Sequence, residues 1–150
     1  MTGQLVWDYR HRTVLLLGPK TQAIVGFAGG RSYTLGGVEV ELKTPFVSLL
    51  FTPLDDRDLS ESTHVLITAM ARDKQTGTRY DKDGNTLLEV GGPPLLMEPV
   101  QARIRIAGPA PKTVRAVDLY GVPTEREVPA EDGWFTIDGR YETYYYEVRR

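Results

Sequence analysis

Glycine and proline occur throughout this chain and divide it into short segments. The 150 residues include 15 glycines and 10 prolines, and the segments between them lack helical periodicity. Several segments instead alternate apolar with polar residues, most clearly 38–43 and 102–106. A period of two is typical of a strand with one buried face. The sequence therefore predicts an all-β fold with less than roughly 10% helix.

Strands are expected at residues 6–9, 13–17, 22–27, 38–43, 46–52, 65–72, 102–106, 113–119, 134–137 and 144–148. Short strands at this spacing indicate a β-sandwich of mainly antiparallel strands, either jelly-roll or immunoglobulin-like. Residues 53–63 are interpreted as a loop, with a possible helical turn at 60–62. The Pro-rich stretch 108–111 is too short to separate domains, so residues 1–150 are expected to form one domain.

Composition excludes several classes of partner. The net charge is −2 with the two signs mixed along the chain, which provides no basic surface for nucleic acid or an anionic membrane. No apolar run approaches the roughly 20 residues that span a bilayer. The first residues show no basic region followed by an apolar one, so no signal peptide is evident. The absence of cysteine excludes disulfides but does not identify a compartment.

A series of short motifs follows one order along the chain. Residues 65–72 read VLITAMAR and lead into a polar turn at 74–77, and residues 91–100 read GGPPLLMEPV. A P-x-x-Q turn begins at Pro19, and a GWFTI strand at 133–137 precedes TYYYE. This order resembles the C-terminal accessory β-sandwich domain, a carbohydrate-binding-module-like domain, of multidomain bacterial glycoside hydrolases. The chain departs from the usual pattern at Gln75, where that turn has Asn, and in its prolines after Ala107.

The resemblance implies a non-catalytic module that binds a polysaccharide or oligosaccharide, since a separate barrel carries the catalysis in such enzymes. It also implies a secreted or cell-surface location as part of a larger enzyme. A first alternative is a structural domain that docks on the catalytic glycoside hydrolase domain and stabilises it, which predicts an exposed apolar patch. A second alternative is a small β-rich glycan-active enzyme that uses acids such as Glu98 and Asp73.

The acidic residues do not form a recognisable catalytic pattern. A glycosidase needs two carboxylates roughly 5 to 9.5 Å apart in a cleft. Glu98 is unusual because apolar residues flank it. It is either a buried acid, or a carboxylate that caps a turn or pairs with an arginine such as Arg72 or Arg103. With two isolated histidines and no cysteine, neither a transition-metal site nor another cofactor is expected.

Asp81, Asp83 and Asn85 place oxygen-bearing side chains at alternate positions, as in the first half of a calcium loop. The second half does not fit, because Thr86 stands at the glycine position and Gly92 at the position of the bidentate glutamate. The same residues suit an ordinary hairpin turn. A turn is favoured, and a weak calcium site remains the alternative.

Aromatic side chains are the candidates for sugar contact, because a planar ring can stack on the apolar face of a pyranose. The candidates are Tyr145, Tyr80, Tyr33 and Trp134. Strand alternation places Tyr144, Tyr146 and Val148 on one face and Tyr145 with Glu147 on the other. For each candidate, the alternative is a core or edge residue whose polar tip reaches water. For Trp134, the alternative also includes docking to another domain.

Overall fold

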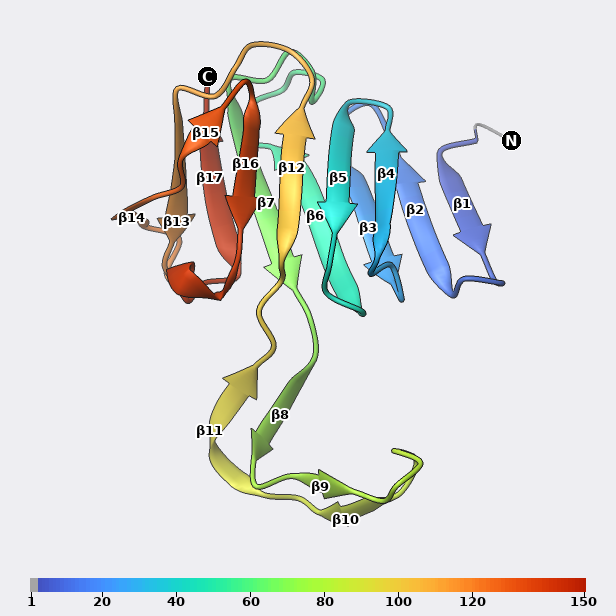
Figure 1. Ribbon diagram of the computed structural model, residues 1–150. Coiled ribbons are helices and arrows are strands. Elements are labelled where there is room, and N and C mark those ends of the chain that lie inside the picture. The colour runs from blue at the N-terminus through green and yellow to red at the C-terminus, as the bar shows by residue number, and fades with distance from the viewer. Residues whose placement is uncertain (1–2) are drawn as a thin grey trace.

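Two antiparallel sheets pack face to face in the computed structural model, which describes residues 3–150 (Figure 1). The eight-stranded sheet contains, in spatial order, β1 (Leu5–Asp8), β2 (Thr13–Leu17), β3 (Gln22–Gly26), β6 (Val47–Pro53), β7 (His64–Met70), β17 (Tyr145–Arg149), β13 (Thr113–Val117) and β14 (Pro123–Glu127). The five-stranded sheet contains β15 (Ala130–Glu131), β16 (Trp134–Ile137), β12 (Ala102–Ile106), β5 (Val38–Leu42) and β4 (Arg31–Leu35). The prediction of an all-β sandwich is confirmed.

Alternating side chains form the core between the sheets. Val38, Val40 and Leu42 of β5 are buried while the residues between them point outward. Their neighbours in β12 follow the same pattern, with Ala102, Ile104 and Ile106 buried. The eight-stranded sheet contributes its own inward row, which includes Leu49, Phe51, Ile67 and Tyr146. Each sheet therefore has one face committed to a shared apolar interior, as expected for a sandwich.

The chain crosses between the two sheets several times. One of these crossings is the Pro-rich stretch 108–111, which connects β12 of the five-stranded sheet to β13 of the eight-stranded sheet. Within residues 3–150, the helical content is limited to a 3-10 turn, Gly139–Tyr141, and no helix in that range could span a bilayer. Next to the possible helical turn at 60–62, the Asp58 carbonyl accepts from the N–H groups of Glu61 and Ser62, which forms a single hydrogen-bonded turn that no helix continues.

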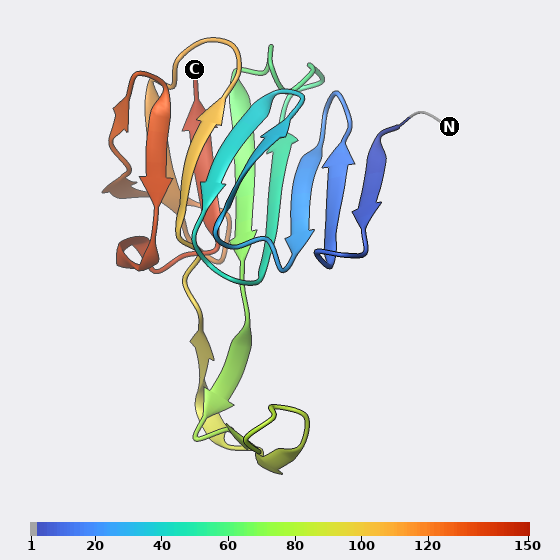
Figure 2. The same ribbon diagram turned by 45° about the vertical axis from the view of Figure 1, so that its right-hand side comes forward.

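The structure corrects the sequence interpretation of residues 71–98. The expected polar turn at 74–77 is largely a strand, β8 (Asp73–Thr76), which pairs with β11 (Gly92–Met97). Beyond it, β9 (Arg79–Tyr80) pairs with β10 (Leu87–Glu89). Both views show this hairpin projecting away from the sandwich (Figures 1 and 2). Residues 71–98 are called the arm below. Polar residues on both faces of β8 concealed the strand, because no period of two distinguishes a buried side.

We expect Ile104→Ala to destabilise the sandwich strongly. The side chain is fully buried in the centre of β12, and removing it leaves a cavity that costs about 2–5 kcal/mol. Chemical denaturation followed by circular dichroism measures the loss. Tyr120→Ala is the matched control, because that ring is 93% exposed, and its effect should stay within about 0.5 kcal/mol. Equal stability losses in the two variants would contradict the assignment of the core.

Candidate functional site

The four predicted sugar-binding aromatics lie in different parts of the molecule. Trp134 lies on the outer face of the five-stranded sheet, while Tyr145 lies on the outer face of the other sheet. Tyr80 lies in the arm and is 50% exposed. Tyr33 packs against the core, and its hydroxyl donates to the Ala28 carbonyl, so it resembles an edge residue more than a stacking platform. The four residues therefore form no common site.

Trp134 has the most developed polar surroundings of the four. Two ladder rows cross the outer face of the five-stranded sheet. One row runs through Thr34, Glu39, Arg105, Trp134 and Glu131, and the other through Ser32, Glu41, Arg103 and Thr136. Cross-strand neighbours on one face lie about 4.5–5.5 Å apart, so these side chains interact directly. Within these two rows, the indole is thus the single large apolar group, and hydroxyl, carboxylate and guanidinium groups surround it.

Two arginines hold the indole in place. The guanidinium carbon of Arg103 lies 4.4 Å from the centroid of the Trp134 ring, and that of Arg105 lies 5.1 Å away. Such cation–π contacts contribute about 0.5–1 kcal/mol each at exposed sites. Each arginine also pairs with a glutamate of β5. Arg105 donates to Glu39, and Arg103 Nη1 lies 3.4 Å from Glu41 Oε1. Both arginines of the two rows are therefore paired with a glutamate, and Glu131 is the remaining charged residue of the rows.

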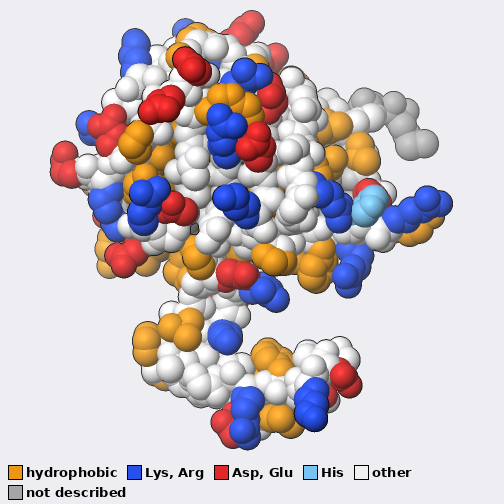
Figure 3. Space-filling view, in the orientation of Figure 1, with side chains coloured by type: hydrophobic (Ala, Val, Ile, Leu, Met, Phe, Trp, Pro, Cys, Tyr) orange, Lys and Arg blue, Asp and Glu red, His pale blue; other side chains and the backbone are white. Residues whose placement is uncertain are grey.

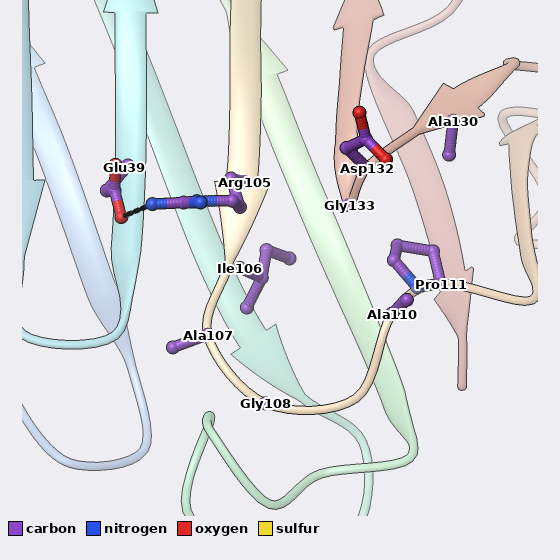
Figure 4. A pocket seen from close by; sticks show the side chains of 10 residues that line it. All are labelled: Glu39, Arg105, Ile106, Ala107, Gly108, Ala110, Pro111, Ala130, Asp132 and Gly133. Atoms are coloured by element: carbon purple, nitrogen blue, oxygen red, sulfur yellow. Dashed lines mark hydrogen bonds and ion pairs between the residues drawn. The ribbon is translucent and has the colours of Figure 1, made fainter.

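Three hollows lie along β12 and β16 around this tryptophan. A hollow of about 610 Å³ lies at one end and is lined by Glu39, Arg105 and Asp132 among others (Figure 4). A hollow of about 240 Å³ lies beside Trp134 itself, and one of about 510 Å³ lies past Arg103 toward Arg140. Arg103 lines the second and third hollows, which makes them neighbours. Figure 3 shows basic and acidic side chains interspersed over this side of the sandwich. We call Trp134, its two ladder rows and the three hollows the tryptophan face.

Tyr145 belongs to a second, smaller polar group on the opposite sheet. Glu147 lies beside it on the outer face, as the sequence predicts. The Glu147 carboxylate lies 2.6 Å from His64 Nε2 and 2.8 Å from Arg149 Nη2. Burial opposes the ionisation of Glu147, but the hydrogen bonds from Arg149 and His64 outweigh it and lower the pKa of the carboxyl group. A hollow of about 520 Å³ lies over this cluster and has mostly apolar walls.

Glu98 is an ion-pair partner and not an isolated buried acid. Arg72 donates to it twice, from Nε over 2.8 Å and from Nη2 over 3.1 Å. These hydrogen bonds lower the pKa of the Glu98 carboxyl group. The expectation that an arginine such as Arg72 pairs with Glu98 is confirmed, and the pair closes the base of the arm. The other acid of the enzymatic alternative, Asp73, pairs with Met97 in the β-ladder at the same place.

Asp81, Asp83 and Asn85 lie at the tip of the arm, between β9 and β10. The Asp81 side chain accepts from the Asn85 N–H over 2.9 Å, and the Asp81 carbonyl accepts from the Gly84 N–H. This is the expected hairpin turn, since a side chain that caps its own backbone is a common turn device. Within residues 3–150, no three His, Cys, Asp or Glu side chains gather closely enough to hold a metal ion.

The part of the eight-stranded sheet formed by β1, β2, β3 and β6 has an unexpectedly apolar outer face. An antiparallel sheet with one solvated side normally carries polar residues there. Here one row of cross-strand neighbours begins with Leu5, Leu16, Ala23 and Leu50. The adjacent row begins with Trp7, Val14 and Val25. Trp7 is 75% exposed and Leu5 is 65% exposed. We call these seven residues the apolar face. Val14, Leu16, Val25 and Leu50 are partly exposed, and the small Ala23 is buried between its neighbours.

Sequence reasoning found Trp134 but missed its neighbours. A signal for them existed, because Glu39 and Glu41 alternate in one predicted strand and Arg103 and Arg105 in another. Opposite charges on the outward positions of two strands favour their pairing. The sequence also contains an indication of the apolar face, since residues 14–17 are all apolar, on both sides of the expected strand. A strand that is apolar on both sides is expected to have both sides covered.

We expect Glu147→Gln to flatten the dependence of stability on pH. Because the folded-state pKa of Glu147 is lowered, its contribution is present above the unfolded value of about 4.3 and is lost as pH falls through the folded value. The substitution should cost about 1–2 kcal/mol at pH 7, where charged hydrogen bonds are lost, and much less at pH 3. Urea unfolding at both pH values measures this. A stability loss that is independent of pH would show that the cluster contributes through packing alone.

Comparison with known proteins gives no identification, because no family model matches the chain and neither a curated protein nor a solved structure matches it.

Proposed function

We propose that this domain is a non-catalytic carbohydrate-binding module of a polysaccharide-degrading glycoside hydrolase, and that it binds glycan on the tryptophan face. The observation that supports this best is Trp134, an indole on a sheet face that otherwise carries only polar and charged side chains. Sugars are recognised by one aromatic plane together with hydroxyl-binding groups around it. The tryptophan face carries a partly exposed indole, with the guanidinium groups of Arg103 and Arg105 beside its ring and hydroxyl and carboxylate groups around it.

The charge balance of the tryptophan face favours a neutral glycan. Arg105 is paired with Glu39 and Arg103 with Glu41, and with Glu131 the two rows carry a net charge of only −1. A cluster of unpaired arginines would favour an acidic polymer. Arginine–glutamate pairs instead offer both donors and acceptors to the hydroxyl groups of a neutral sugar. Binding should therefore depend little on ionic strength.

The row of hollows favours a chain over a single sugar. The second and third hollows share Arg103 and Arg140, and the first shares Arg105 with the surroundings of Trp134. Consecutive sugar units of an extended polymer would occupy them in turn along β12 and β16. The module would then raise the local concentration of a tethered catalytic domain on its polymer. The catalytic domain would degrade the polymer faster, although the module itself catalyses no step.

The proposal includes no catalytic residue in this domain. Glu98 stood out in the sequence, but Arg72 lowers the pKa of Glu98, whereas the general acid of a glycosidase needs a raised pKa. We therefore expect the isolated domain to hydrolyse no aryl glycoside or polysaccharide. Turnover that disappears in Glu98→Gln would contradict this part of the proposal.

We expect the affinity for neutral oligosaccharides to rise with chain length and to depend on Trp134. Calorimetric titration with cello-, xylo-, manno- and chito-oligosaccharides of increasing length measures this, with a pull-down on the insoluble polymers. Stacking contributes on the order of 0.5–1.5 kcal/mol, so Trp134→Ala should weaken binding about 3- to 10-fold. In a Trp7→Phe background, Trp134 is the single tryptophan, and its fluorescence should change on binding.

Tyr145→Ala and Tyr80→Ala are the matched controls, since they remove aromatic rings that lie away from the tryptophan face. Their affinities should equal that of the unchanged chain. A loss in Tyr145→Ala with none in Trp134→Ala would move the site to the opposite sheet. Absence of binding to every polymer in the panel would remove the proposed function.

A further inference from the structure

Strands β8 to β11 of the arm make extensive contacts only with one another, while Ala71 at the base packs against the core. A two-stranded hairpin is at best marginally stable by itself in water. The arm nevertheless exposes a large share of apolar side chains, among them Tyr80, Leu87, Leu88, Val90, Leu95 and Leu96. A hollow of about 870 Å³ separates its stem and tip from Phe46 at the base of the sandwich. Hydrophobic groups are visible along it in the space-filling view (Figure 3).

The arm is nonetheless shaped by specific contacts. The Arg72–Glu98 pair closes its base, and Arg79 donates to Glu89 across the tip over 2.6 Å. Thr78 Oγ1 donates to the Val90 carbonyl over 2.7 Å. A Cβ at Gly91 would lie 2.3 Å from the Thr76 carbonyl oxygen, and its φ of +76° also favours glycine. These contacts give the arm a defined form, although both of its sides are left exposed.

The same chain carries a second uncovered apolar surface, the apolar face on β1, β2, β3 and β6. The arm cannot cover it within one molecule, because it leaves the ends of β7 and β12 and projects away from the sandwich in both views (Figures 1 and 2). Each molecule thus has a projecting apolar hairpin and a separate apolar face. A second copy of the chain can cover both the arm and the apolar face at once.

We propose that two copies of this chain associate by exchanging arms, so that the arm of each lies against the apolar face of the other. A two-fold arrangement makes every contact occur twice and closes the assembly. Charge offers no barrier, since the apolar face is uncharged and the arm carries four basic and five acidic residues.

The areas agree with a dimer that uses both surfaces. Four strands at about 4.8 Å spacing and about 17 Å length offer on the order of 300 Å² on the apolar face. The arm bends between its stem, β8 and β11, and its tip, β9 and β10 (Figures 1 and 2), so the area of the apolar face limits each contact to on the order of 300 Å². One contact is far below the roughly 800 Å² per partner of a standard interface, and two contacts together bury about 600 Å² per partner, at the lower end of the range for specific interfaces.

Sedimentation equilibrium of the complete chain from about 1 to 100 µM tests the proposal, and a dimer is expected. Leu87→Ser with Leu95→Ser in the arm should weaken the dimer at least tenfold. Leu5→Thr with Leu16→Thr on the apolar face should weaken it equally. Tyr120→Ser, which removes a ring exposed on the turn after β13, is the control and should leave the dimer intact. Circular dichroism and melting temperature confirm that each variant is folded.

Mixing the two variants separates arm exchange from simple packing of face on face. The arm variant keeps a working face and the face variant keeps a working arm, so the mixture regains one of the two contacts. Its weight-average mass at 100 µM should therefore exceed that of either variant alone, while staying below that of the unchanged chain. A dimer that survives both sets of substitutions, or that responds to the face alone, overturns the proposal. A monomer at 100 µM also overturns it and leaves another domain, such as a catalytic barrel, as the occupant. Because Trp134 lies outside both surfaces, glycan binding is tested independently.

Discussion

The sandwich depends on the interlocking of two apolar rows, one from each sheet. Phe51, Ile67 and Tyr146 meet Val40 and Ile104 in an interior that excludes water. Since each strand commits alternate residues to this interior, its outward residues are free to serve other purposes. The two outer faces have accordingly diverged in chemistry while the inner faces remain alike. The outer face of the five-stranded sheet carries paired charges around an indole. The outer face of the other sheet carries mainly apolar side chains over β1, β2, β3 and β6 and the charged Glu147 cluster over β7 and β17.

The sequence predicted the parts of the fold that have local periodicity. Residues 38–42 and 102–106 alternate cleanly, and both are strands whose apolar residues are buried. The arm was missed because Asp73–Thr76 is polar on both sides and its pairing with Gly92–Met97 depends on residues far away in the chain. The strand Arg31–Leu35 was missed for a related reason, since Tyr33 and Leu35 alone mark its inner side. Strands without a buried face have no pattern to detect.

The tryptophan face shows the same limit at the level of a site. Trp134 was recognisable as a candidate from its residue type. Its partners Arg105 and Glu39 lie 29 and 95 residues away in the chain and become neighbours only through the order of strands in the sheet. The order of strands in the sheet cannot be predicted from the residues of any one segment. Tyr33 illustrates the opposite outcome, because an aromatic residue of suitable type turned inward to the core.

The position of the arm gives the sandwich a mechanical property. Its two strands continue from β7 of the eight-stranded sheet and into β12 of the five-stranded sheet. Any pull on the tip is therefore transmitted along the backbone of both strands to the two layers at once. The pairing of β8 with β11 and the Arg72–Glu98 pair keep the two strands together at the base. The layers are thus drawn in the same direction, and the core between them is subject to little shear.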